Sequence, residues 1–426
     1  MVGLTAEGTP LRDVSEVADF ARRCFLPSTT DRVGVELEFL VFDSAAAGRH
    51  VPLARVERAL PALPGGSRVT FEPGGQLELS GPAGALPDAL AGMAADVAAV
   101  REALRAAGMA LAGVGLDPVR PARRQLSQPR YEAMAEFLGV PYGPLMMCST
   151  ASIQVNLDLG ERPAQRWERA HVLGPVLMAA FANSPLSRGR PSGWMSGRQA
   201  VWDHLDRSRT APVPASGDPA ADWAEYLLDA RLMLIRDDEE RCRPVRDGST
   251  FRDWLEGGGA RRPTAEDLAY HATTVFPPVR PRGWLEIRYL DAQHPLTWPV
   301  ALAVTHALVA DDRAADAATA AVEPYLGPYR PYLGPYLGPG AGQYRELWEG
   351  AARCGLADPR LRRAAERCFR AALEALPRLG AGPGLVGEVA AFADRHVTPG
   401  RSPAADLMDP TPGRHVPAWL NDEGQA

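Results

Sequence analysis

The sequence predicts an α+β protein in which a mainly antiparallel sheet carries helices on one face. Two observations lead to this class. Four stretches alternate between polar and apolar residues, which is typical of strands with one buried and one open face. Helical patterns of mixed spacing separate these stretches. If the polar strand faces lie on one side of the sheet, they form a concave basin, and helices cover the apolar side.

The first strand is expected at residues 31–43, "DRVGVELEFLVFD". Side chains alternate along a strand, so Glu36 and Glu38 share one face, about 7 Å apart. Leu40 and Phe42 continue that face and do not suit open water. The strand therefore reads as buried, with two like charges on one side.

A hairpin is expected at residues 67–81, "SRVTFEPGGQLELSG". Its turn is Pro73-Gly74-Gly75, since proline and glycine favour a tight reversal between short strands. On the second arm Gln76, Glu78 and Ser80 share a face, and Leu77 and Leu79 share the other. This arm adds a third carboxylate to the predicted basin.

The third and fourth strands follow the same rule. In "STASIQVNLDLG", residues 149–160, the polar face carries Gln154 and Asn156. In "RGWLEIRYLDAQ", residues 282–293, Glu286 and Arg288 face one way and Ile287 faces the other. The basin is thus expected to contain amides and one arginine beside its carboxylates.

Helical patterns occupy residues 88–107, 166–181, 220–235, 264–275 and 299–309, and residues 344–396 read as helices only. Thr264 and Asp267 have the spacing of a capping box. The repeat "PYLGPYRPYLGPYLGPG", residues 324–340, is rich in proline and is expected to be an extended insertion; a tyrosine–proline ligand for a partner is the alternative. We expect one domain over residues 1–398 and a Pro-rich polar tail over residues 399–426.

The composition limits the possible chemistry. The 426 residues include 46 basic ones, and none of these is lysine. Phosphate must therefore be met by arginine, backbone N–H or metal, and there is no Schiff-base or Walker-type lysine. A net charge of −6 gives no general attraction to nucleic acid or to an anionic membrane. The five scattered cysteines, and a start without a basic or apolar leader, favour a cytoplasmic protein with reduced thiols.

The clustered acids of the basin suggest a metal site. Neighbouring carboxylates repel one another unless a cation joins them, and an oxygen-rich set without His or Cys suits Mg²⁺ or Mn²⁺. A nucleotide triphosphate held through metals, with Arg288 placed for the transferred phosphoryl group, would fit this set. Arginine-rich loops at residues 183–210 and 276–284, which include Arg198, suit carboxylate or phosphate capture.

Two simpler interpretations compete with the metal site. Glutamates at alternate strand positions commonly form a solvated sheet face. The carboxylates could also hold a structural divalent ion in a binding protein that turns over no ATP. Arg288 beside Glu286 argues mildly against that second possibility, because a structural cation gains nothing from a neighbouring positive charge.

Several long motifs resemble the glutamate–cysteine ligases of actinobacteria, closest to the branch that supplies γ-glutamylcysteine for ergothioneine synthesis. They are "GVELEF", "EPGGQLELSGP", "MMCSTASIQVNLD", "NSPLSRGRPSGW", "YHATTVFPPVRPRGWLEIRYLDAQ" and "GLADPRLRRAAERCFRAALEALPRLG". The resemblance runs from about residue 12 to 398 and implies a single catalytic domain. It also implies a glutamine-synthetase-like core, in which a curved antiparallel sheet forms an active-site funnel.

The resemblance implies the following roles, residue by residue. The metal ligands, for two or three Mg²⁺, are Glu36, Glu38, Glu78 and Glu286. Arg288 resembles the catalytic, phosphate-facing arginine that also binds the nucleotide. Substrate contacts are expected from Glu72, Gln154, Asn156 and Arg198, with Glu72 also a weaker candidate for a metal ligand.

The implied reaction uses ATP, L-glutamate and L-cysteine. The γ-carboxylate of glutamate attacks the γ-phosphate of ATP, and the amine of cysteine then attacks the γ-glutamyl phosphate. The product is γ-glutamylcysteine. A related ligase that joins glutamate to a different amine is the alternative, because the same sheet and metals would serve it.

Overall fold

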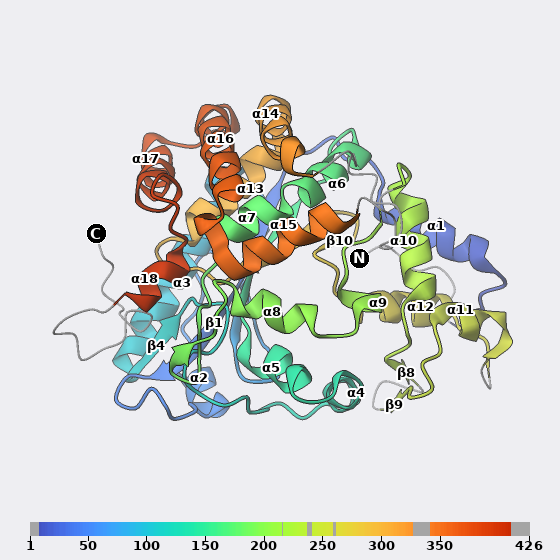
Figure 1. Cartoon of the computed structure of the whole chain (residues 1–426). Coiled ribbons are helices and arrows are strands. Elements are labelled where there is room, and N and C mark those ends of the chain that lie inside the picture. Colours follow the sequence, from blue (N-terminus) through green and yellow to red (C-terminus); the bar gives the residue numbers. More distant parts are fainter. Residues whose placement is uncertain (1–7, 215, 237–240, 259–260, 327–340, 410–426) are drawn as a thin grey trace.

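The protein is described from a computed structural model, which defines residues 8–214, 216–236, 241–258, 261–326 and 341–409 (Figure 1). A 7-stranded sheet, antiparallel at every pairing, has the order β10-β11-β5-β1-β3-β2, and β4 pairs with the second half of β1. The strands are β1 (Val33–Asp43), β2 (Arg68–Phe71), β3 (Leu77–Ser80), β4 (Met109–Ala112), β5 (Ser152–Leu157), β10 (Val279–Pro281) and β11 (Leu285–Asp291). The α+β class and the mainly antiparallel sheet expected from the sequence are confirmed.

The helices vary widely in length. They are α1 (Val14–Cys24), α2 (Leu53–Ala59), α3 (Leu86–Ala106), α4 (Pro129–Leu138), α5 (Tyr142–Ser149), α6 (Pro163–Val172), α7 (Gly174–Ala180), α8 (Gly197–Asp203), α9 (Arg207–Thr210), α10 (Pro219–Asp229), α11 (Phe251–Asp253), α12 (Ala265–Ala272), α13 (Trp298–Ala310), α14 (Asp312–Val322), α15 (Ala341–Cys354), α16 (Pro359–Ala375), α17 (Pro383–Phe392) and α18 (Pro403–Met408). Two short hairpins, β6–β7 (Leu186–Ser187, Arg190–Pro191) and β8–β9 (Leu234–Arg236, Cys242–Pro244), lie outside the main sheet.

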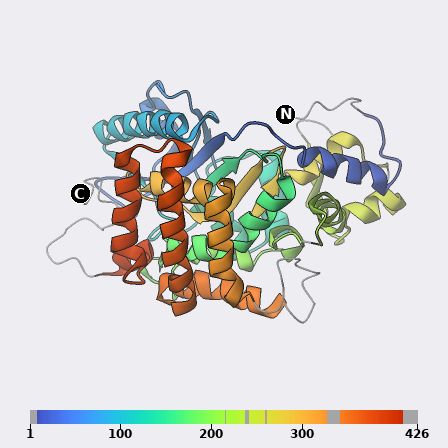
Figure 2. The same cartoon turned by 90° about the horizontal axis from the view of Figure 1, so that it is seen from above.

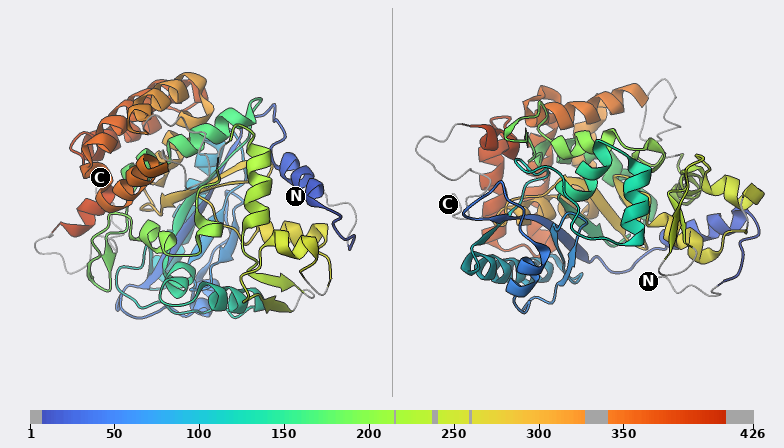
Figure 3. Two further views of the ribbon diagram at one scale, coloured as in Figure 1. Left: turned by 45° about the vertical axis from the view of Figure 1, so that its right-hand side comes forward. Right: turned by 90° about the horizontal axis from the view of Figure 1, so that it is seen from below.

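The apolar side of the sheet packs on helices. Leu37, Ile153, Val155 and Ile287 are buried in the main hydrophobic cluster, and α3, α7 and α13 contact β1, β11 and β5 respectively. Burying each such side chain contributes about 1.5–3 kcal/mol. Behind these helices α14 packs on α16, and α16 on α17, so the C-terminal helices form a second layer that is seen from above in Figure 2. In Figure 3 the strands of the sheet are seen in the middle of the molecule, beside this layer of C-terminal helices.

The apolar end of the polar face of β1 is also covered. Leu40 and Phe42 lie in a separate cluster with Ala110 and Ala112 of β4, because β4 pairs with this half of β1. The Arg120 guanidinium lies 3.7 Å from the centre of the Phe42 ring. One face of β1 is therefore carboxylate at its first half and apolar core at its second.

The geometry of the turn between β2 and β3 explains why two glycines, Gly74 and Gly75, occur there. Gly75 has φ +87°, a conformation that L side chains rarely adopt. At Gly74 a Cβ would come within 2.3 Å of the carbonyl oxygen of Cys148, so only glycine lets the turn approach α5 this closely. The predicted hairpin is confirmed, with β2 and β3 paired from Arg68↔Ser80 to Phe71↔Leu77.

Three predicted helices need correction. The helix at residues 166–181 is divided into α6 and α7 at Leu173, and Pro175 is the second residue of α7, in the first turn where its missing N–H costs little. The helix at residues 220–235 ends at Asp229, and Leu234–Arg236 is strand β8. The helix at residues 264–275 ends at Ala272, although its capping box between Thr264 and Asp267 is confirmed.

The C-terminal third is helical among its described residues, as predicted. Of the repeat at 324–340, only the first three residues are described; Leu326 is buried, and the rest lies outside the described residues. The segment expected as a tail is described to Asp409. There the Ser402 hydroxyl donates to the Ala179 carbonyl at 2.7 Å and accepts from the Leu356 N–H at 2.9 Å, which holds it against α7. Among the described helices, none combines the length and apolarity needed to span a bilayer.

Candidate active site

A cavity of about 350 Å³ opens on the polar face of the sheet. Strands β1, β2, β3, β5, β10 and β11 form its floor, and α4, α5 and α8 contribute to its walls. Its charged lining residues are Glu36, Glu38, Arg68, Glu72, Glu78, Arg130, Arg198, Arg280, Arg282, Glu286 and Arg288. The structure thus brings together the acids that the sequence predicted from separate strands.

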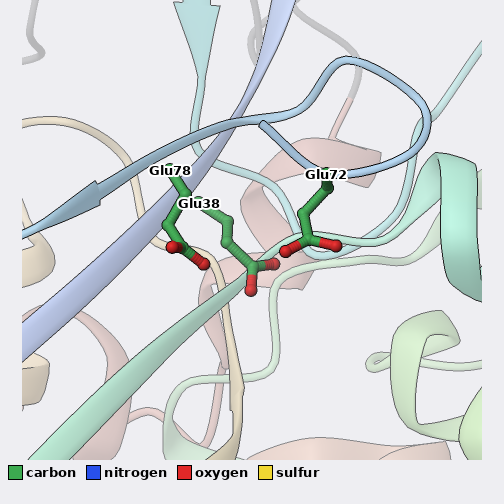
Figure 4. A group of neighbouring side chains, drawn as sticks. All are labelled: Glu38, Glu72 and Glu78. Atoms are coloured by element: carbon green, nitrogen blue, oxygen red, sulfur yellow. The ribbon is translucent and has the colours of Figure 1, made fainter. Parts of the chain in front are cut away.

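Three of these acids form a cluster. One carboxylate oxygen from each of Glu38, Glu72 and Glu78 lies within 4.8 Å of the other two, and the three carboxylates turn toward a common point (Figure 4). Glu38 on β1 and Glu78 on β3 are directly paired across the two strands. Glu72 reaches them from the hairpin turn, whose shape is fixed by the Glu72 N–H donating to the Gln76 carbonyl at 2.9 Å. Directly opposed like charges are destabilising in a sheet, so this arrangement requires a function or a partner.

Hydrogen bonds orient two of the three carboxylates. Glu38 accepts from the Ser152 N–H at 2.8 Å and from Gln154 Nε2 at 2.9 Å. Glu78 accepts from the hydroxyls of Thr70 and Ser80. Each donor lies on a neighbouring strand or two residues along the same strand, so the sheet itself positions the cluster.

The cluster disfavours ionisation without a cation. Burial, and next the charges of Glu38 and Glu78, raise the pKa of Glu72 to about 8. Burial also raises the pKa of Glu78, with the charge of Glu38 adding to it. At Glu38 burial raises the pKa although Arg198 and Arg288 oppose the shift. A divalent cation would remove this repulsion, and an all-oxygen donor set suits a hard ion such as Mg²⁺.

Glu286 lies apart from this cluster, among arginines. Its buried carboxylate accepts from Arg280 Nε at 2.6 Å, Arg282 NH1 at 3.0 Å and Arg288 NH1 at 2.9 Å. Burial alone would raise the pKa of Glu286, but the arginines, Arg280 first, hold it well below its usual range. Arg280 also donates to the Val275 carbonyl at 3.1 Å, so it is fixed at both ends. We call Arg280, Arg282 and Arg288 the arginine fan.

Polar residues of β5 connect the two groups. Gln154 accepts from Arg288 NH1 and donates to Glu38, so one side chain joins the fan to the acid cluster. Asn156 donates to Glu36 at 3.1 Å and accepts from Trp284 Nε1 at 3.0 Å. Burial, then the charges of Glu286 and Glu78, raise the pKa of Glu36, which lies between the two groups.

A bulge in β11 adjusts the position of Arg288. The pairing with β5 shifts register between Ile287 and Leu290, so that two β11 residues, Arg288 and Tyr289, face the single residue Gln154. The Arg288 N–H donates to the Pro278 carbonyl at 2.8 Å rather than to β5. The Arg288 side chain still faces the cavity, and the Tyr289 hydroxyl reaches the Ala170 carbonyl on the helical side.

Arg198 enters the cavity from α8. Its NH2 donates to the Arg288 carbonyl at 2.9 Å, and the side chain is buried. The start of α8 is fixed by Asp291, which accepts from the hydroxyls of Ser184 and Ser196 at 2.7 and 2.8 Å. The arginine-rich loop noted in the sequence therefore contributes one guanidinium to the site through a buried polar network.

Arg68, Arg130 and Tyr131 are among the lining residues that the sequence did not predict. Arg68 and Thr70 alternate along β2, and Glu72 follows directly after its end; this pattern could have identified Arg68. Arg130 and Tyr131 come from α4, which strand alternation does not predict. Arg130 donates to the hydroxyl and carbonyl of Thr273 at 2.8 and 2.9 Å.

Comparisons with known proteins agree with the motifs. The family described as Glutamate-cysteine ligase family 2 (GCS2) matches residues 32–418. The glutamate–cysteine ligase EgtA of Mycobacterium tuberculosis (strain ATCC 25618 / H37Rv) is 42% identical over 417 residues, covering 94% of this chain and 90% of that protein. EgtA of Mycolicibacterium smegmatis is 40% identical over 406 residues, covering 92% and 90%. A chloroplastic glutamate–cysteine ligase of Medicago truncatula is 31% identical over 241 residues, covering 53% of this chain and 47% of that protein.

Proposed function

Because this chain belongs to glutamate–cysteine ligase family 2, we propose that it joins the γ-carboxylate of L-glutamate to the amine of L-cysteine, at the expense of ATP. The products are γ-glutamylcysteine, ADP and phosphate. The names of its mycobacterial relatives favour a place in ergothioneine synthesis. The cytoplasm, expected from the sequence, is the proposed location.

One observation carries the mechanism: a single cavity holds a carboxylate cluster at one side and an arginine fan at the other. Transfer of a phosphoryl group needs positive charge on the triphosphate and on the moving group. The chain contains no lysine to supply it. Guanidinium groups and divalent cations can supply it instead, and the lining of the cavity suits both.

The residues present fit Mg²⁺. The carboxylates of Glu38, Glu72 and Glu78 would bind the ion jointly. Glu36 is close enough for the charge of Glu78 to raise its pKa. When bound, the ion supplies charge neutralisation for the phosphates of ATP. Glu286, expected as a ligand from the resemblance, accepts from three guanidinium groups, and their positive charge disfavours a cation beside it.

The arginine fan supplies positive charge at the other side of the cavity. Glu286 uses both oxygens to hold three guanidinium groups together, where they can meet the phosphoryl oxygens of a nucleotide. Gln154 fixes the orientation of Arg288, which we propose as the residue that stabilises the transferred group. Arg198, Asn156 and Gln154 remain the proposed contacts to the amino-acid substrates.

The reaction balances in two steps. An oxygen of the glutamate γ-carboxylate attacks the γ-phosphorus of ATP and the bond to the ADP oxygen breaks. The neutral amine of cysteine then attacks the acyl carbon, the amide bond forms and phosphate leaves with one former carboxylate oxygen. The proton lost by the nitrogen goes to solvent or to a carboxylate of the site.

The test is product formation with labelled glutamate. Protein, ATP, Mg²⁺, cysteine and glutamate labelled with ¹⁸O in its γ-carboxylate should give γ-glutamylcysteine and phosphate carrying one ¹⁸O, both detected by mass spectrometry. Omitting any one component should abolish the dipeptide. Product without label in the phosphate would contradict the acyl phosphate, and turnover with another amine but not with cysteine would contradict the assigned acceptor.

A further inference from the structure

A second cavity, of about 310 Å³, lies beside the first and is not used by the proposed reaction. Helix α8 borders both: Arg198 and Trp202 line the first cavity, and Gln199 and Asp203 line the second. These pairs form two stripes about 100° apart on the helix. A small space of about 20 Å³, lined by residues of both cavities, lies between them.

Three large aromatic side chains line the second cavity. Trp194 comes from the loop before α8, and Tyr344 and Trp348 come from α15. The rings of Tyr344 and Trp348 lie 6.0 Å apart, and Tyr344 is held by its hydroxyl donating to the His171 carbonyl at 2.8 Å. Fixed aromatic walls of this kind are typical of sites that bind small organic molecules.

Two acids line this cavity, the partly buried Asp203 and the exposed Glu349. Asp203 Oδ1 accepts from Gln199 Nε2 at 2.8 Å, and no hydrogen bond from the described residues reaches its Oδ2. Burial raises the pKa of Asp203; the Gln199 hydrogen bond and Arg207 oppose this shift, and Glu349 adds to it. A carboxylate in such a place gains stability from any cation that reaches it.

The arginines around this cavity have other contacts. Arg345 Nε lies 3.2 Å from Glu349 Oε1, and the Arg353 guanidinium lies 4.4 Å from the centre of the Trp194 ring. Arg207 also interacts with another residue, and its charge lowers the pKa of Asp203. Asp203 Oδ2 therefore offers a ligand an acceptor in a cavity that three aromatic side chains also line.

We propose that this second cavity binds a small organic cation: a protonated amine on an aromatic or apolar body, with the ammonium on Asp203 and the body against Tyr344 and Trp348. A carboxylate supplies the charge, and the negative faces of aromatic rings add to the attraction for a cation. This site is separate from the acid cluster and from the arginine fan, so it stands independently of the proposed ligation.

The probe is 4-fluorobenzylamine, titrated against the full-length protein and followed by ¹⁹F NMR, with 4-fluorobenzyl alcohol as its neutral counterpart. We expect the amine to bind at least about tenfold more tightly than the alcohol, because only the amine pairs with Asp203. Asp203→Asn should weaken amine binding at least about tenfold and leave alcohol binding unchanged. Glu346→Gln, an exposed change on α15 that does not line the cavity, should have no effect.

Other variants decide where the amine binds. Ala211→Leu fills the cavity from its wall without changing a charge and should abolish binding, which keeps the test open if Asp203→Asn does not fold. Glu72→Gln should leave amine binding unchanged, whatever its effect on catalysis. The proposal would be overturned if the amine and the alcohol bound equally well. It would also be overturned if Asp203→Asn bound the amine as tightly as the unaltered protein, or if Glu72→Gln lost amine binding.

Discussion

At the scale of single residues, the acid cluster predicts a separation between folding and activity. The Glu78 carboxylate accepts from two hydroxyls, and a hydroxyl can rotate to accept instead of donate. Glu78→Gln should therefore keep its hydrogen bonds while losing the charge that would hold a cation. Outer contacts of a metal site commonly cost 10–100-fold in activity, so we expect a loss of at least about 100-fold here.

The measurement is phosphate release from ATP, with glutamate and cysteine, over a range of Mg²⁺ concentrations. Glu102→Gln, an exposed change on α3, is the matched control and should behave as the unaltered protein. Far-ultraviolet circular dichroism checks that both variants fold. An unchanged Mg²⁺ dependence in Glu78→Gln would remove this residue from the cation site.

Most of the charged residues of the site could be predicted, but their grouping could not. Alternation along β1, β3, β5 and β11 placed Glu36, Glu38, Glu78 and Glu286 on one face, because the period of a strand is two. Alternation does not give strand order, and so it does not distinguish a carboxylate beside two others from one beside three arginines. Glu72 joins the acid cluster through the shape of a turn, which the spacing alone does not specify.

At the scale of elements, the short strand β10 decides what surrounds Glu286. Its register, Arg280↔Glu286, places a buried arginine directly opposite a buried carboxylate. The sequence did not predict β10 as a strand, because Val279–Pro281 is only three residues long and is preceded by two prolines. Prolines are accepted at a sheet edge, where one N–H needs no partner, and β10 is at the edge.

The arginine fan allows two ion pairs to the same acid to be compared. The Arg280 side chain is 10% exposed and that of Arg282 is 43% exposed. Removing one partner of a buried pair typically costs about 3–5 kcal/mol, whereas an exposed pair is worth about 0–1 kcal/mol. We expect Arg280→Met to lower the free energy of unfolding by roughly 3 kcal/mol, and Arg282→Met by less than about 1 kcal/mol.

Urea denaturation of the two variants, followed by tryptophan fluorescence, gives this comparison directly. Both substitutions keep an unbranched side chain and remove a single charge, so each serves as the other's control. Equal losses of stability would mean that Glu286 does not depend on its buried partner.

Other elements show where local pattern fails. The apolar run before residue 235 suits a helix or a strand equally well, and pairing of β8 with β9 decides the outcome at Leu234–Arg236. By contrast, α3 and α13 begin two and one residues before the predicted residues 88 and 299, respectively. Long periodic patterns with buried faces were therefore predictable, and short strands held by tertiary pairing were not.

At the scale of the whole molecule, the cluster links stability to pH. An unfolded glutamate titrates near pH 4.5, and the pKa of Glu72 in the folded protein is raised to about 8. Between these values the folded chain holds a proton that the unfolded chain has released. The free energy of unfolding must then fall as pH rises through this range, by up to roughly 1 kcal/mol per pH unit.

We expect Glu72→Gln to be more stable than the unaltered protein at pH 8 and nearly equal to it at pH 5, when both are measured in EDTA. Urea denaturation at pH 5, 6.5 and 8 provides the curves. Saturating Mg²⁺ should remove the difference at pH 8, because it stabilises the ionised cluster. Parallel curves for the two proteins would show that Glu72 ionises normally.

The use of arginine and not lysine around the site protects the protein from modification by its own intermediate. An acyl phosphate is an acylating agent, and a side-chain amine close to it would be modified in place of the intended acceptor. This chain has 46 basic residues and no lysine among them. Guanidinium stays protonated at any physiological pH and is a poor nucleophile. The protein can therefore surround its own activated intermediate with positive charge and offer it no ε-amino group to damage.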